Sequence, residues 1–164
     1  MSLDFRELVY EDESLLLDFY SCLCSTSSFL LIDENMINLE KNINEYIKRI
    51  TKDNNICLVA VKDDKIVGHV TGEISNYYKK RHVMEISMGI LPYVKGIGFD
   101  LLSRFIHLAI QRKLYKLEGS VIESNSRFLH LLITKFGFFI EGRKINSVIT
   151  ANGYESEYLL GKIL

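Results

Sequence analysis

Two closely spaced glycines, Gly96 and Gly98, follow an apolar stretch of the chain and precede a helically patterned one. Glycines at a strand-to-helix turn let the backbone come close to a ligand. The free N–H groups of the helix's first turn then point at that ligand, and the helix dipole favours a negative charge there, most often a phosphate. So short a glycine motif is equally compatible with a plain tight turn, and both interpretations stay open.

The elements on either side of the glycines are predicted from their patterning. Residues 84–91 are short, apolar and uncharged apart from Glu85, which is typical of a strand. After Pro92, residues 99–113 carry apolar side chains at helical spacing. The sequence therefore predicts a strand, a glycine turn and a long helix, in that order.

Two families of nucleotide-binding loops can be tested on the same residues. A Walker loop ends in Gly-Lys-Ser/Thr, which this turn lacks. A dinucleotide fingerprint needs a third small residue, and Leu101 occupies that position. Glu118 lies about 20 residues further on, where an acid that binds ribose is expected, so dinucleotide binding is kept as an alternative.

Several motifs in a fixed order resemble those of the GCN5-related N-acetyltransferases (GNAT family), which bind acetyl-CoA. Residues 93–98 (Tyr-Val-Lys-Gly-Ile-Gly) fill the frame of the family's Arg/Gln-x-x-Gly-x-Gly/Ala turn. Residues 121–125 and 135–138 resemble its downstream strand with an Asn and its Gly-Phe signature, and residues 152–155 resemble its final hairpin. The similarity covers residues 56–164 well and the first third of the chain in outline.

The resemblance implies that acetyl-CoA is the co-substrate and that the strand before the turn splays from its neighbour. The pantetheine arm would pair with this strand, and the pyrophosphate would lie on the N–H groups of the turn. Asn125 would bond the pantetheine and could also cap the next helix. The residues expected at the coenzyme are Met88, Gly89, Ile90, Leu91, Lys95, Gly96, Ile97, Gly98, Phe99, Asp100 and Asn125.

The reaction that the resemblance implies is direct transfer of the acetyl group to a primary amine of a small molecule, a protein N-terminus or a lysine. A base must take the amine's proton. We favour Glu85, because a carboxylate on an otherwise apolar strand needs a partner or a purpose. His82 is the second choice, since histidine suits proton transfer near neutral pH. Their structural alternatives are an outward-facing glutamate and a loop-end histidine. A backbone N–H near Ile90 would stabilise the oxyanion.

Two positions depart from the family pattern. The family usually protonates the leaving thiolate with a tyrosine four residues before the glycine of Gly-Phe, and Ile133 occupies that position with Leu132 beside it. Tyr93 stands where Arg or Gln is usual in the turn. An acyl-CoA-binding module with weak or no turnover is therefore kept as the alternative to an enzyme.

Composition bounds the remaining possibilities. The chain has 164 residues, of which 48% are hydrophobic and 25% charged, with a formal net charge of −1. This profile fits one globular domain over residues 1–164, with no basic excess for nucleic acid and no apolar run that could span a membrane. Three cysteines without metal-ligand spacing fit reduced thiols. We therefore expect a cytoplasmic protein without a metal, either a monomer or a homodimer.

The rest of the pattern predicts the order β-α-α-β-β-β-α-β-α-β-β. Besides the elements above, we expect strands at 5–10, 56–61, 65–75, 116–123, 138–149 and 154–164, and helices at 15–23, 33–52 and 127–136. Asn152-Gly153 signals a hairpin turn, and the basic residues of the loop 76–81 either are solvated or contact the 3′-phosphate of coenzyme A. We expect a single-domain α/β fold with a mixed, mostly antiparallel sheet flanked by helices and splayed central strands.

Overall fold

The structure, a computed structural model, describes residues 3–27, 29, 40–52 and 54–164. Its centre is a seven-stranded sheet in the order β1-β2-β3-β4-β5-β7-β6. Neighbouring strands are antiparallel except β4 and β5, which are parallel. The strands are β1 (Leu3–Glu7), β2 (Ile56–Lys62), β3 (Lys65–Ile74), β4 (Val83–Ile90), β5 (Lys116–Ile122), β6 (Phe139–Thr150) and β7 (Gly153–Ile163).

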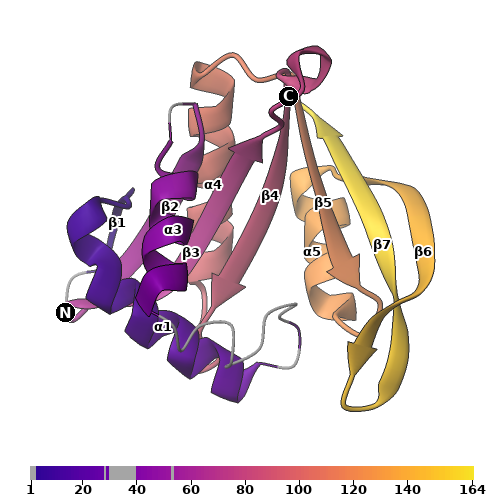
Figure 1. Ribbon diagram of the computed structural model, residues 1–164. Helices are drawn as coiled ribbons and strands as arrows, with labels where there is room; N and C mark the ends of the chain where they lie inside the picture. Colours follow the sequence, from indigo (N-terminus) through magenta and orange to yellow (C-terminus); the bar gives the residue numbers. More distant parts are fainter. Residues whose placement is uncertain (1–2, 28, 30–39, 53) are drawn as a thin grey trace.

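Helices cover both faces of the sheet. They are α1 (Glu13–Thr26), α3 (Glu40–Ile50), α4 (Ile97–Gln111) and α5 (Ser126–Phe136), with short 3-10 turns at η1 (Tyr10–Asp12) and η2 (Tyr78–Lys80). In Figure 1, α1 and α3 lie in front of β2 and β3, and α4 lies behind them. The element order and the mostly antiparallel sheet confirm the predicted α/β fold.

The apolar stripes of the helices explain this layering. In α3, Ile43, Ile47 and Ile50 are buried, as their helical spacing predicts. The helix was expected from residue 33, but residues 30–39 lie outside the described part of the chain. On the opposite face, Phe105 of α4 is fully buried against the sheet. The central strands β2 and β3 are therefore covered on both sides, which is why they are almost continuously apolar.

In the C-terminal third of the chain, two glycines determine where a helix ends and where a hairpin turns. Helix α5 ends at Gly137, whose left-handed φ of 67° stops the helix as predicted. The hairpin of β6 and β7 turns at Gly153, which has a φ of 106°. One feature was not expected: between Lys144 and Val148 the β6 register shifts, so that residues 145–147 lie opposite Ser156 alone. Such a β-bulge leaves the extra residues unpaired and locally changes the direction of the edge strand.

Neither a membrane-spanning helix nor a disulfide is present in the described residues. No helix there is long and apolar enough to cross a bilayer. Cys57 is buried, Cys22 and Cys24 are half-buried, and none of the three forms a disulfide. Burial raises the pKa of the Cys57 thiol to about 12, so this cysteine is an inert core residue.

Candidate active site

The site begins where β4 and β5 part. The two strands share three register pairs, of which the last joins Glu85 to Glu118. Beyond it, β4 stays paired with β3 as far as Ile90, and β5 stays paired with β7 as far as Ile122. Figure 1 shows the two strands diverging from this point. The expected splayed central strands are therefore present.

A cavity of about 400 Å³ occupies the space between the parted strands. Its walls are residues 85–90 of β4 and 119–122 of β5, with Glu157 and Leu160 of β7. Side chains from both faces of the sheet close it, Leu23 from α1 and Leu132 from α5 among them. A cavity of this size, mostly apolar with a few polar groups, is typical of a small-molecule or cofactor site.

The glycine turn lies at the β4 edge of the cavity, and its two glycines are required for different reasons. Gly96 has a left-handed φ of 87° with no atom near its missing side chain, so it is needed for its backbone conformation. Gly98 packs closely against β4, because an added Cβ would lie 2.9 Å from Ile90 Cδ1, which would have to shift, and 3.6 Å from Met88 Cε. Since Met88 and Ile90 line the cavity, the N-terminus of α4 is held against its β4 wall.

The structure separates the residues expected at the coenzyme into three groups. Met88, Gly89, Ile90 and Asn125 line the cavity. Residues 95–100 form the turn and the start of α4, which begins at Ile97, two residues before its predicted start. Leu91 is buried, and its N–H donates to Val67 O at 3.0 Å, so this amide is already used by β3.

Asn125 occupies the N-cap position of α5, but its side chain makes no capping hydrogen bond. The prediction that it caps the helix through its side chain is therefore wrong. Asn125 does line the cavity. The expected bond of Asn125 to the pantetheine stays a prediction.

Glu85 lies at the point where the strands part and lines two cavities. It is in register with Glu73 of β3 and Glu118 of β5, and side chains opposite in register share one face of a sheet. These three glutamates border a second cavity of about 460 Å³, together with Arg49 and Lys80. Glu73 pairs with Arg49 at 3.0 Å and Glu118 with Lys116 at 2.8 Å. Glu85 makes no ion pair within the described residues.

The other candidate base is placed differently. His82 precedes β4, and its ring centroid lies 6.0 Å from that of Tyr115 with the two rings tilted by 56°. Its carbonyl accepts hydrogen bonds from the Tyr115 and Lys116 N–H groups. It lines neither cavity. The basic loop 76–81 is also at this start of β4, about 25 Å from the glycine turn for a strand of this length, too far to share one phosphate site with it.

Helix α5 offers no proton donor to the cavity. Ile133, at the position of the family's tyrosine, is 37% exposed and does not line the cavity. The α5 side chains that do are Phe128 and Leu132. Among the described residues that line the cavity, α5 therefore contributes no side chain that could protonate a thiolate, as the sequence predicts.

A buried polar network between β3 and the helices α1 and α3 was not anticipated. His69 of β3 is opposite Gly89 in register, and its Nε2 lies 3.1 Å from the Tyr20 hydroxyl, which bonds the Tyr46 hydroxyl at 2.8 Å. A Cβ on Gly89 would lie 2.7 Å from Leu23 Cδ2 and 3.3 Å from His69 Nε2. This packing supports the splayed strand from the α1 side. A histidine within an apolar strand is the sequence signal that could have identified it.

Burial sets the protonation of this network. Complete desolvation lowers the pKa of His69 to about 4, so the imidazole is neutral near pH 7. Burial also raises the pKa of Tyr46 to about 12 and that of Tyr20 well above its ordinary range. His69 Nδ1 has no hydrogen-bond partner among the described residues. The network is therefore neutral and acts as packing behind the site.

A second carboxylate, also unanticipated, lines the cavity. Glu157 of β7 is only 7% exposed and accepts hydrogen bonds from Ser120 Oγ and Ser147 Oγ, each at 2.8 Å. The sequence around Glu157 does not mark it as buried, because its burial depends on strands that are distant in the chain.

The remaining predictions concern nucleotides and metals. The dinucleotide interpretation requires a doubly wound parallel sheet, and this sheet has one parallel pair. Its acidic residue, Glu118, is paired with Lys116 rather than free for a ribose. Within the described residues, no group of three or more His, Cys, Asp or Glu side chains could hold a metal ion.

Comparison with known proteins adds independent information. Residues 17–138 match the sequence model of the acetyltransferase (GNAT) family. The fold superposes on the acetyltransferase of the GNAT family from Streptococcus pneumoniae with a TM-score of 0.88 and 26% identity, covering 99% of this chain and 100% of that one. No curated protein sequence matches the chain significantly.

Two more distant structures show the same fold. Ribosomal-protein-alanine N-acetyltransferase from Brucella melitensis has a TM-score of 0.85 at 22% identity, with 98% of this chain and 99% of that chain covered. The putative acetyltransferase yncA from Salmonella typhimurium, solved with its cofactor acetyl-CoA, has a TM-score of 0.86 at 16% identity, with 100% and 95% covered.

Proposed function

Because the chain belongs to the GNAT acetyltransferase family, we propose that it transfers the acetyl group of acetyl-CoA to a primary amine in a ternary complex. One observation carries the proposal: β4 and β5 part after Glu85, and the cavity between them borders the glycine turn at the start of α4. An extended amide chain can add to a free strand edge, and a phosphate suits a helix N-terminus. The coenzyme offers both groups.

The coenzyme-binding residues are assigned on this basis. The pyrophosphate lies on the N–H groups of residues 95–100, and the pantetheine runs along residues 88–90. Leu91 contributes its buried side chain rather than its amide, which β3 already holds. Asn125 bonds the pantetheine through its side-chain amide.

In the reaction, the neutral amine attacks the thioester carbonyl and a C–N bond forms. The backbone N–H near Ile90 stabilises the oxyanion, and the C–S bond then breaks. Glu85 takes the amine's proton, directly or through water, because it lines both cavities and has no cationic partner among the described residues. His82 is the weaker candidate, since it lines neither cavity. The departing thiolate takes a proton from water, as α5 supplies no donor.

The alternative, an acyl-CoA-binding module with weak or no turnover, is favoured by the same α5 observation: Phe128 and Leu132 occupy the wall from which a general acid would act. For either function we propose a cytoplasmic location, which three cysteines without a disulfide fit.

Two measurements test the function. Acetyl-CoA at about 100 times its dissociation constant adds roughly 2.7 kcal/mol of stability, a rise in melting temperature of several degrees for a domain of this size. Release of free thiol from acetyl-CoA is then followed with a panel of primary amines. A thermal shift with amine-dependent thiol release supports the enzyme, and a shift without release supports the binding module. No shift at millimolar acetyl-CoA contradicts both.

A further inference from the structure

Glu157 is a buried carboxylate without a cation. It is 7% exposed and forms no ion pair among the described residues. Lys144 is opposite it in the β6–β7 register, but this lysine is exposed and forms no ion pair with it. Two serine hydroxyls, of Ser120 and Ser147, each donate one hydrogen bond to it. Two neutral donors do not neutralise a charge removed from water, and buried charges are normally paired. The carboxylate therefore lines the cavity without an ion pair, which leaves it available to a positively charged ligand.

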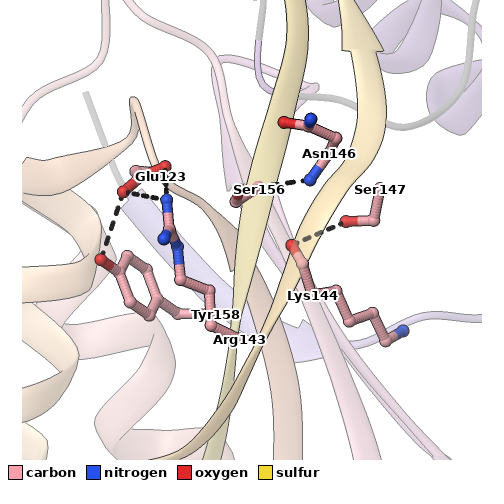
Figure 2. Close-up of polar contacts among 7 residues, drawn as sticks. All are labelled: Glu123, Arg143, Lys144, Asn146, Ser147, Ser156 and Tyr158. Carbon is pink, nitrogen blue, oxygen red and sulfur yellow. Dashed lines mark hydrogen bonds and ion pairs between the residues drawn. The ribbon is translucent and has the colours of Figure 1, made fainter.

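The bulge in β6 is what builds this site. Residues 145–147 lie opposite Ser156 alone, and Asn146 has a φ of 51°. Figure 2 shows Asn146 N–H bonded to Ser156 Oγ, at 3.3 Å, with Ser147 projecting from the bulge. The extra residues bring the Ser147 hydroxyl to Glu157 Oε2. Without the bulge, the edge strand would not place a donor there.

The strands beside the bulge are fixed by a separate cluster. In Figure 2, Arg143 of β6 and Tyr158 of β7 both point to Glu123, which Arg143 bonds at 2.7 Å. Arg143 also lies over the Tyr158 ring, with 5.8 Å from Cζ to the ring centroid. Because Tyr158 is adjacent to Glu157 along β7, its side chain points to the other face. The contacts of Glu123 with Arg143 and Tyr158 therefore fix the strands on either side of Glu157 without involving its carboxylate.

Register places Glu157 in the half of the cavity that faces the acceptor. It is opposite Ile122 of β5, and Ile122 shares a face with Glu118, which is opposite Glu85. Gly98 instead contacts Met88 and Ile90, which alternate with Glu85 along β4 and point to the other face. The glycine turn and Glu157 are thus on opposite faces of the sheet, and the pantetheine arm, which has no positive charge, cannot be the partner of Glu157.

Glu85 and Glu157 line the same cavity at separate points. Ile122 is four residues beyond Glu118, which corresponds to about 13 Å along β5. One ammonium group cannot satisfy both carboxylates over such a separation. If Glu85 serves the reacting amine, as the proposed function requires, the charge of Glu157 is left for another group of the same acceptor.

We propose that the acceptor carries a second positively charged group and that Glu157 binds it. The inference rests on the proposed function and gives it a substrate class: diamines and related dications with an apolar spacer. Each oxygen of Glu157 has accepting capacity beyond its one serine, enough for an ammonium with three donors. Leu23 and Ile122, also in the lining, provide the apolar surface along which an aliphatic spacer packs.

The test compares pairs of ligands that differ by one charge. Isothermal titrations use diamines from 1,3-diaminopropane to 1,6-diaminohexane and the monoamines of the same chain length, with and without coenzyme A. We expect the best diamine to bind the wild type about ten- to a hundredfold more tightly than its monoamine, the range for a charge-assisted hydrogen bond. Equal binding of every pair by the wild type overturns the proposal.

Variants assign the preference to one residue. Glu157→Gln keeps the size and can still hydrogen-bond both serines, whose hydroxyls donate or accept, but it removes the charge and should abolish the preference. Glu155→Gln is the matched control: Glu155 is on the same strand and face, bonds Thr150, and does not line the cavity. A preference that survives Glu157→Gln overturns the proposal. If that variant does not fold, the wild-type comparison still decides.

The proposed function is checked separately on the same samples. If acetyl-CoA raises the melting temperature of the wild type but diamines bind no better than monoamines, the acetyltransferase proposal stands and the proposal for Glu157 is wrong. A wild type that prefers diamines but shows no response to acetyl-CoA gives the opposite result.

Discussion

The β4 wall and the β5–β7 wall of the cavity differ in the kind of group that they present. The β4 wall is built around glycines, with Gly89 and Gly98 required by packing and Gly96 by its φ of 87°. The opposite wall presents side chains, Glu157 and Ser120 among them. The β4 wall also carries side chains, Glu85 and Met88 among them, but the glycine turn beside it offers backbone N–H groups. Backbone groups are not altered by a substitution in the way that the side chains of the opposite wall are. We infer that coenzyme binding is assigned to the first wall and acceptor choice to the second.

The largest expected effect falls on turnover and leaves coenzyme binding unchanged, although Glu85 itself lies on the β4 wall. Glu85→Gln should reduce the acetylation rate by about 10²–10⁴, the usual contribution of a general base, while acetyl-CoA still raises the melting temperature. His82→Gln is the matched control, and a wild-type rate for Glu85→Gln would make Glu85 structural.

Gly98→Val should do the reverse and remove coenzyme binding from a folded protein. Even a Cβ would lie 2.9 Å from Ile90 Cδ1, and the branched side chain would push α4 away from the cavity wall. Far-UV circular dichroism should stay near the wild type while the acetyl-CoA thermal shift is lost. Gly142→Ala serves as control, because its Cβ would meet Leu159 Cδ1 at an ordinary 3.7 Å. Unchanged binding by Gly98→Val would reduce the glycine pair to a turn.

The packing behind β4 should make stability depend on pH. As the pH falls through about 6.5, an unfolded histidine takes up a proton, whereas folded His69 stays neutral until about pH 4. The unfolded state then binds more protons, so the free energy of unfolding should fall by up to about 3 kcal/mol between these values. Urea titrations at pH 7 and 4.5 measure the loss. His69→Gln should show a smaller loss, and an identical slope in both proteins would contradict the assignment.

The smallest effect concerns the strand itself. Gly89→Ala adds a methyl group 2.7 Å from Leu23 Cδ2 and 3.3 Å from His69 Nε2, and overpacking of this kind costs about 1–3 kcal/mol. Leu23→Ala alone should cost about 2–5 kcal/mol, because Leu23 is buried. The double variant Gly89→Ala, Leu23→Ala should lose less stability than the sum of the two single losses, because it removes the atom in conflict. Chemical denaturation of all three variants checks this. Additive losses would show that α1 does not press on β4 at this point.

The sequence predicted those features of the two walls that depend on residues adjacent in the chain. The strand predicted at 84–91 is observed at Val83–Ile90, and Gly137 ends α5, because each depends on residues that are adjacent in the chain. The hydrogen bond of the Leu91 amide to Val67 O and the missing side-chain cap at Asn125 were not predicted, because each depends on which of several partners takes the hydrogen bond.

The opposite wall depends on distant parts of the chain. Glu157 is placed by the β5–β7 register and by a bulge whose three residues have no turn motif in the sequence. His69 becomes buried only when α1 and α3 close over β3, where Tyr20 and Tyr46 meet it. Glu157 has no signature within a short window. His69 is marked in the sequence only as a histidine within an apolar strand, and its partners Tyr20 and Tyr46 could be found only from the structure.

Hydrogen–deuterium exchange with and without acetyl-CoA tests the central claim most directly, because it reports where the coenzyme binds. The account predicts slower exchange of the amides of residues 88–90 and 95–100 on adding acetyl-CoA, with the Leu91 amide already slow because Val67 O holds it. Protection confined to the loop 76–81 and the second cavity, or no protection in β4 and the start of α4, would contradict it.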